Sequence, residues 1–333
     1  MSGMRTLREW WSARRRFEFC LTVAMVMALT GVCVALIMLP NTVLPKPQAA
    51  QPGMTEALGR AAAADPRLEE VRRIVEPFGP IVARQVPTGD GRHSLVVGHP
   101  DQRVEIDVLE RALPDATAAV TDVWGPGWAQ SALVVVASSP SEFAALVRSA
   151  GLLPAEVAAA SIADPFTPGS RPTGQRVVFG PDTGRRLDPE GMATLLRHEL
   201  THIAARADTV DGAPLWMLEG FADYTAHHRE ISRFADIAPT LTARAHAGQI
   251  PGDLPTDADF SGPDAAFTYE QAWSICAFVA EKYDRPRLVQ LYHRIAAGKQ
   301  NPSTEDQILR EVLGATRTEF IADWHTWLRA QTA

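Results

Sequence analysis

The chain has 333 residues, of which 46% are hydrophobic and 21% are charged, and it shows no internal repeat or low-complexity array. This length suits one two-lobed domain, or two small domains with a tail. The formal net charge is −7, and residues 1–18 hold five arginines against two glutamates, so the remainder of the chain carries −10. An acidic body without a basic stripe argues against a nucleic-acid partner.

Residues 19–40 form an apolar run of 22 residues without a charge, long enough to cross a bilayer as a helix. Because the arginines precede this run, the positive-inside rule places residues 1–18 in the cytoplasm and the rest of the chain outside the membrane. We therefore expect a single-pass signal anchor. The alternative is a cleaved signal peptide and a secreted protein, although Gln48, Ala49 and Ala50 make a poor cleavage site.

Residues 41–90 are rich in proline, alanine and glycine, and we expect a stalk or a loosely packed lead-in. From residue 91 the hydrophobic pattern becomes that of alternating strands and helices. The strands are expected at residues 93–99, 132–137, 157–163 and 175–180, and the helices at residues 103–123 and 141–150.

The next segment carries an H-E-x-x-H motif, formed by His198, Glu199 and His202. Asp188 can cap a helix here and Pro189 fits its first turn. Histidines four residues apart lie on one face of a helix, where both imidazoles can reach one metal ion, and this geometry suits zinc. Glu199 lies beside that face, positioned to act on a metal-bound water without binding the metal.

A second predicted helix begins at Trp216 and carries Glu219 and Asp223 on one face. Catalytic zinc typically has three protein ligands, and two histidines with a glutamate are one of the standard sets, so Glu219 completes the site. Asp223 is placed to accept a hydrogen bond from the outward nitrogen of a ligating histidine. Gly220 is small, as a close approach to the first helix requires.

These two segments together resemble the gluzincin metallopeptidases, which follow H-E-x-x-H with E-x-x-x-D some twenty residues later. The sequence motifs H-E-L-T-H at residues 198–202 and P-x-W-x-x-E-G-x-A-x-Y at residues 214–224 are similar to those of the peptidase MA-like domains. The resemblance implies one zinc ion bound by His198, His202 and Glu219, Glu199 as general base, and Asp223 as support for a ligand.

The resemblance also implies an α+β, thermolysin-like fold of two lobes, and the transmembrane helix expected from the apolar run would precede it. The mixed α/β lobe with the zinc helix would cover residues 91–214, and the helical lobe residues 215–333. Gluzincins place a sheet edge that pairs with extended peptide beside the zinc helix, and residues 176–180 are expected to supply it; an ordinary sheet strand is the alternative. After Tyr224 we expect a loop at residues 248–263 and helices at residues 229–247, 264–283, 286–296, 303–313 and 317–328.

Hydrolysis at zinc generates an oxyanion, and related gluzincin aminopeptidases supply a tyrosine to it from a Y-E-x-G/A context. Tyr269, in the stretch TYEQA, fits this role, and the alternative is a tyrosine packed at the start of a helix. His227, His228 and His293 are lesser candidates.

The sequence therefore predicts a membrane-tethered, extracytoplasmic zinc metallopeptidase that acts on peptides or proteins. No G-x-M-E-N stretch, which holds the free amine of a substrate in the aminopeptidases, precedes the zinc helix, and this favours an endopeptidase. One alternative is a catalytically idle ectodomain that binds peptides or partners through the same fold. The other is a non-enzymatic protein in which the motif is coincidental.

Overall fold

The computed structural model describes residue 62 and residues 65–154, 157–167 and 170–333. The expected membrane segment, residues 19–40, lies outside these ranges. Among the helices that the structure describes, none combines the length and the apolar character needed to cross a bilayer.

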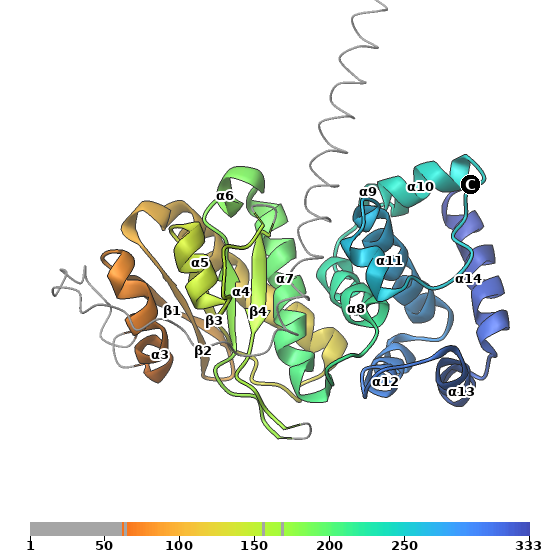
Figure 1. Ribbon diagram of the computed structural model, residues 1–333, viewed down its shortest axis with the longest axis horizontal. Helices are drawn as coiled ribbons and strands as arrows, with labels where there is room; N and C mark the ends of the chain where they lie inside the picture. Colours follow the sequence, from red (N-terminus) through yellow and green to blue (C-terminus); the bar gives the residue numbers. More distant parts are fainter. Residues whose placement is uncertain (1–61, 63–64, 155–156, 168–169) are drawn as a thin grey trace, which may run out of the picture.

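The first lobe is built on a single sheet of five strands, in the order β1-β2-β3-β5-β4 (Figure 1). The strands are β1 (Val82–Gly89), β2 (Arg92–Gly98), β3 (Leu133–Val136), β4 (Ala159–Ile162) and β5 (Arg176–Phe179). The three central strands run parallel, and β1 and β4 pair antiparallel at the two edges. Every residue of β3 is buried, as expected for a strand covered on both faces.

Helices cover both faces of this sheet. One apolar cluster joins one face to α4 (Arg103–Trp124) and α7 (Pro189–Ala205). A second cluster joins the opposite face to α3 (Pro66–Val75) and α5 (Pro140–Leu146). Short helical turns complete this lobe, namely η1 (Glu76–Phe78), η2 (Pro100–Gln102), α6 (Thr183–Arg186) and η3 (Arg206–Asp208).

The second lobe is helical and has its own apolar core around α8 and α11 (Figure 1). Its elements are α8 (Leu215–His227), α9 (Phe234–Ile237), α10 (Pro239–His246), η4 (Asp257–Ser261), α11 (Ala265–Lys282), α12 (Arg285–Ile295), α13 (Pro302–Leu313) and α14 (Arg317–Gln331). The mixed α/β lobe followed by a helical lobe agrees with the sequence-based expectation. The two lobes meet where α7 packs on α8.

Three expectations can be compared with the structure element by element. Part of the expected lead-in, residues 65–90, contributes α3 and β1 to the first lobe. Residues 176–180 were expected either at a sheet edge or as an ordinary sheet strand, and the second alternative holds, because β5 pairs with β3 on one side and β4 on the other and the edge beside α7 is β4. The single helix expected at residues 229–247 is divided into α9 and α10, because the residue before Pro239 is disfavoured in a helical conformation.

Gly220 was expected to face the first metal-site helix, α7, but in the structure it faces α11, because Glu219 and Asp223 occupy the side of α8 that meets α7. A Cβ atom at this position would lie 2.3 Å from the Ala272 carbonyl oxygen and 3.1 Å from Cys276 Sγ. A backbone oxygen cannot move aside as the end of a flexible side chain can. The absence of a side chain at Gly220 therefore lets α8 carry Glu219 between α7 and the helical core.

We predict that Gly220→Ala destabilises the protein by about 1–3 kcal/mol, because overpacking forces the two helices apart and outweighs alanine's better helix propensity. Urea unfolding followed by circular dichroism measures this. Gly252→Ala is the matched control, since its Cβ would meet no atom within 4 Å. Equal stability of the two variants would contradict the assigned packing role.

Candidate metal centre

The helix α7 places His198, Glu199 and His202 in the interior between the two lobes. Asp188 caps it by accepting a hydrogen bond from the Gly191 amide at 2.8 Å, and Pro189 occupies its first position, as the sequence predicts. All three motif side chains are buried, with exposed fractions of 1%, 0% and 9% in chain order. This burial follows from α7 packing on the sheet with one face and on α8 with another.

The helix α8 supplies two further acidic side chains. Glu219 is fully buried, and Asp223, one turn later on the same face, is 6% exposed. Asp223 Oδ1 lies 2.7 Å from His198 Nδ1, so this nitrogen donates to the carboxylate and His198 Nε2 is left to face the centre of the cluster. The spacing in the sequence predicts this contact.

Three ligand-type atoms converge at one point. His198 Nε2 and His202 Nε2 are 3.1 Å apart, and they lie 3.4 and 3.5 Å from the two carboxylate oxygens of Glu219. No other group of three histidine, cysteine or carboxylate side chains in the described part of the chain has its ligand atoms so close together.

These distances fit a zinc ion. With zinc–ligand bonds of about 2.0–2.1 Å, the ligand atoms at the corners of a tetrahedron are about 3.3 Å apart. Glu219 also has two buried oxygens that receive no hydrogen bond of ordinary geometry from any described residue. A buried carboxylate is otherwise hydrogen-bonded or bound to a cation. The residues present therefore suit a divalent metal with two nitrogen ligands and one oxygen ligand.

The charged groups of the cluster shift one another's pKa values. Burial raises the pKa of Glu219 to about 7, against the lowering effect of His198, and the charges of Asp223 and Glu199 add to the rise. Burial opposes protonation of His198, but the carboxylates of Asp223 and Glu219 outweigh it and raise its pKa well above the usual value. Burial and the neighbouring His198 lower the pKa of His202. The carboxylates of Asp223 and Glu219 therefore favour a positive charge, whether a proton or a cation, next to His198.

The two other residues expected at the site are placed less directly. Glu199 is fully buried in α7, directly after His198. Tyr269 lies in α11, fully buried, with its ring edge-on to Phe260 at 5.0 Å. The helix α11 packs directly against α8, and Tyr269 belongs to the apolar core of the helical lobe.

The lesser histidine candidates have partners elsewhere. His227 Nδ1 lies 2.7 Å from Glu230, and His228 Nδ1 donates to the Thr225 carbonyl at 2.9 Å. The His293 ring packs on Trp124 with the ring centres 4.7 Å apart. None of these three belongs to the group of converging ligand atoms.

Two residues near the site were not singled out from the sequence. Burial raises the pKa of Tyr292, the hydrogen bond with Thr209 opposes this rise, and the charge of Glu219 adds to it. Arg197, the residue before His198, is 7% exposed and bonds to the end of α8. No motif or residue spacing in the sequence points to either residue, because their proximity to the site depends on how helices distant in the sequence pack together.

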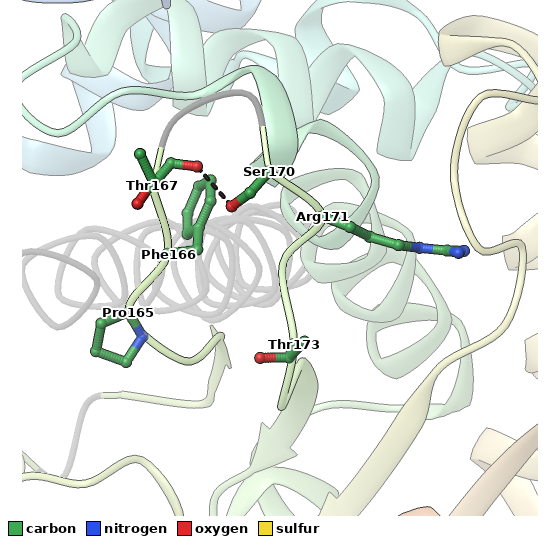
Figure 2. A pocket seen from close by; sticks show the side chains of 6 residues that line it. All are labelled: Pro165, Phe166, Thr167, Ser170, Arg171 and Thr173. Carbon is green, nitrogen blue, oxygen red and sulfur yellow. Dashed lines mark hydrogen bonds between the residues drawn. The ribbon is translucent and has the colours of Figure 1, made fainter.

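A separate pocket lies in the turn between β4 and β5 (Figure 2). None of its lining residues belongs to the metal cluster, and the side chain of Arg171 points away from it. The turn contacts the end of α7, where the Arg206 guanidinium stacks on Phe166 at 4.3 Å. The lining residues are Pro165, Phe166, Thr167, Ser170, Arg171 and Thr173.

No protein-family model and no curated protein matches the chain. Solved structures similar to it include the M1 zinc metallopeptidase from Deinococcus radiodurans, at 15% identity and a TM-score of 0.42. A point variant of that enzyme matches at 16% identity and a TM-score of 0.43. The same variant bound to a Tyr-Ser-Ala substrate matches at 16% identity and a TM-score of 0.42. Each match covers 77% of this chain and 53% of the other, so the chain spans about half the length of these structures. Likeness at these TM-scores does not establish the family.

We predict that zinc affinity falls as the pH drops below 7. The pKa of Glu219 is about 7 in the metal-free fold, so the fraction of protonated Glu219 grows below that pH, and zinc must displace the proton. Each displaced proton weakens binding by about tenfold per pH unit. Competition with a chromophoric chelator at pH 7.5, 6.5 and 5.5 measures the dissociation constant. A constant value across this range would show that no protonated ligand group is involved.

Proposed function

We propose that this chain is a zinc-dependent metallopeptidase whose ligands are His198, His202 and Glu219. The observation that carries the proposal is the convergence of three buried ligand atoms at 3.1–3.5 Å, the spacing of the corners of a zinc tetrahedron. Three ligands from the protein leave the fourth position open to water or substrate, which is the arrangement of catalytic rather than structural zinc sites.

In this proposal Glu199 is the general base. Bound zinc supplies Lewis acidity, which makes water a competent nucleophile near neutral pH and polarises a carbonyl group. Glu199 takes the proton from the attacking water and returns it to the leaving nitrogen as the C–N bond breaks. Glu199 lies between the two proposed histidine ligands in the sequence of α7, a position that would let its carboxylate act on a bound water without itself being a ligand.

Two further residues support the reaction. Asp223 fixes the orientation and tautomer of His198 through the 2.7 Å contact and increases the basicity of the imidazole. Tyr269 is proposed to donate a hydrogen bond to the oxyanion as charge develops there. The support for this second role is its sequence context, the stretch TYEQA at residues 268–272.

The substrate is proposed to be a peptide or protein cleaved at internal bonds. This preference rests on the sequence, which lacks the amine-holding G-x-M-E-N stretch before α7. One of the similar solved structures, from Deinococcus radiodurans, is bound to the short peptide Tyr-Ser-Ala, so cleavage that starts from a free amino terminus has to be tested beside cleavage of internal bonds. A peptide panel with free and acetylated amino termini separates the two modes, because an endopeptidase accepts both.

The membrane tether is proposed from residues 19–40, whose apolar run is too long for an ordinary signal peptide. We predict that the full chain sediments with membranes and that a protease added to intact cells removes the domain beyond residue 41. A soluble mature protein beginning near Ala50 would instead indicate cleavage and secretion.

We predict that Glu199→Gln lowers peptide hydrolysis by at least about 10²-fold while the protein still binds one zinc, because the amide cannot take a proton. Glu219→Gln is the paired variant and should lose tight zinc binding as well as activity. Mass spectrometry measures the zinc content of each variant, and digestion of a peptide library measures its hydrolytic activity. Undiminished cleavage by Glu199→Gln would reject the proposed base, and no cleavage by the unaltered, zinc-loaded protein would favour the idle peptide-binding ectodomain.

We predict that Tyr269→Phe lowers kcat by about 10²–10³-fold and leaves KM and zinc content nearly unchanged. Tyr292→Phe is the control, since the Tyr292 hydroxyl already bonds to Thr209 Oγ1 at 2.8 Å, and its loss should cost about 1 kcal/mol of stability without a selective loss of turnover. If steady-state kinetics show that Tyr292→Phe lowers kcat and Tyr269→Phe does not, Tyr292 and not Tyr269 would be the oxyanion donor.

A further inference from the structure

Arg197 joins the two helices that carry the metal ligands. It precedes His198 in α7, and its guanidinium is buried at the end of α8. Its Nε donates to the Ala226 carbonyl at 2.6 Å. Ala226 lies in the last turn of α8, where carbonyl groups lack partners within the helix, and a cation there is favoured by the helix dipole.

The same guanidinium holds the chain just beyond α8. Its Nη2 donates to Glu230 Oε1 and to Thr194 Oγ1, the latter at 2.8 Å. Glu230 also bonds His227 Nδ1 through its other oxygen at 2.7 Å. Burial opposes ionisation of Glu230, but His227 and Arg197 outweigh it and lower its pKa, so the carboxylate is held as an anion. The planar fork of arginine matches this set of acceptors better than a lysine ammonium does.

This contact continues the line of contacts that forms the metal centre. Along one face of α8, Glu219 faces His202 and His198, Asp223 bonds His198, and Ala226 bonds Arg197. These positions are four and three residues apart, so they lie on successive turns of the same face. Arg197 is therefore the next attachment of α8 to α7 beyond the Asp223 contact.

We propose that Arg197 is a positioning residue that sets the spacing of α7 and α8 and thereby the affinity of the zinc site. The inference rests on the proposed function, because it requires His198, His202 and Glu219 to bind zinc. Without Arg197, the Ala226 carbonyl and the Glu230 carboxylate lose their buried donor, and the end of α8 is free to move toward solvent. A small shift of α8 moves Glu219 out of bonding distance, since zinc tolerates little change in ligand position.

The experiment compares zinc affinity in Arg197→Met with that in Arg176→Met. Arg176 is a matched control, because it is also buried, donates from Nε and Nη2 to the Leu146 carbonyl and pairs with Glu70, but lies in β5 away from α8. Both variants lose one positive charge and one buried carbonyl partner. The zinc dissociation constant is measured by chelator competition, well below the unfolding temperature of each variant.

We expect Arg197→Met to weaken zinc binding by at least about tenfold, as loss of an outer support of a ligand does, and Arg176→Met to leave it within about twofold. Arg197→Lys should fall between Arg197→Met and the unaltered protein, and it carries the test if the methionine variant does not fold. Equal zinc affinity of the Arg197 variants and the unaltered protein would overturn the inference alone. Absence of zinc binding in the unaltered protein would overturn the proposed function as well.

Discussion

The burial of acidic groups between two helices is the constraint on which this structure depends. Glu199, Glu219 and Asp223 lie in the interior together with two imidazoles, and their negative charge must be compensated there. Isolated buried charges are costly, and a protein either neutralises them or supplies a counter-charge. Burial raises the pKa of Glu219 to about 7, so that near neutral pH a proton and a divalent cation would compete for this carboxylate. Zinc and protons therefore compete for one centre, and the same burial that makes the metal-free cluster costly favours zinc.

The rest of the fold holds this centre in place. The sheet and α4 support α7 from one side, and the helical lobe supports α8 through its packing on α11. The contacts between α7 and α8 show that the two helices run antiparallel, because positions later in α8 meet positions earlier in α7. Gly220 permits the close approach behind Glu219, and Arg197 fastens the far end of α8. Neither residue takes part in the chemistry, yet both determine where Glu219 lies.

The sequence predicts the parts of this arrangement that depend on local spacing. Histidines four residues apart on a capped helix, and Glu219 followed by Asp223 on another, must each share a face whatever the surroundings. The sequence left open whether β5 lies at a sheet edge or in the interior, because strand order is set by pairings between distant segments, and an apolar run like that of β5 occurs in both positions. β1 was missed since Arg84, Gln85 and Pro87 interrupt its alternation, and only Ala83 and Val86 are buried along it. Arg197 and Tyr292 could not be found, because their importance arises from the packing of α7, α8 and α12.

The central claim, that two histidines and a carboxylate bind one zinc, is tested most directly by X-ray absorption at the zinc edge of the purified domain. The account predicts one zinc per chain, with only nitrogen and oxygen neighbours at about 2.0–2.1 Å and the multiple scattering of two imidazoles. Cys276, the one cysteine in the part of the chain that the structure describes, packs in the core beside Gly220 and should not contribute. A zinc–sulfur distance of about 2.3 Å, or a spectrum that keeps both imidazoles in His202→Ala, would contradict the account.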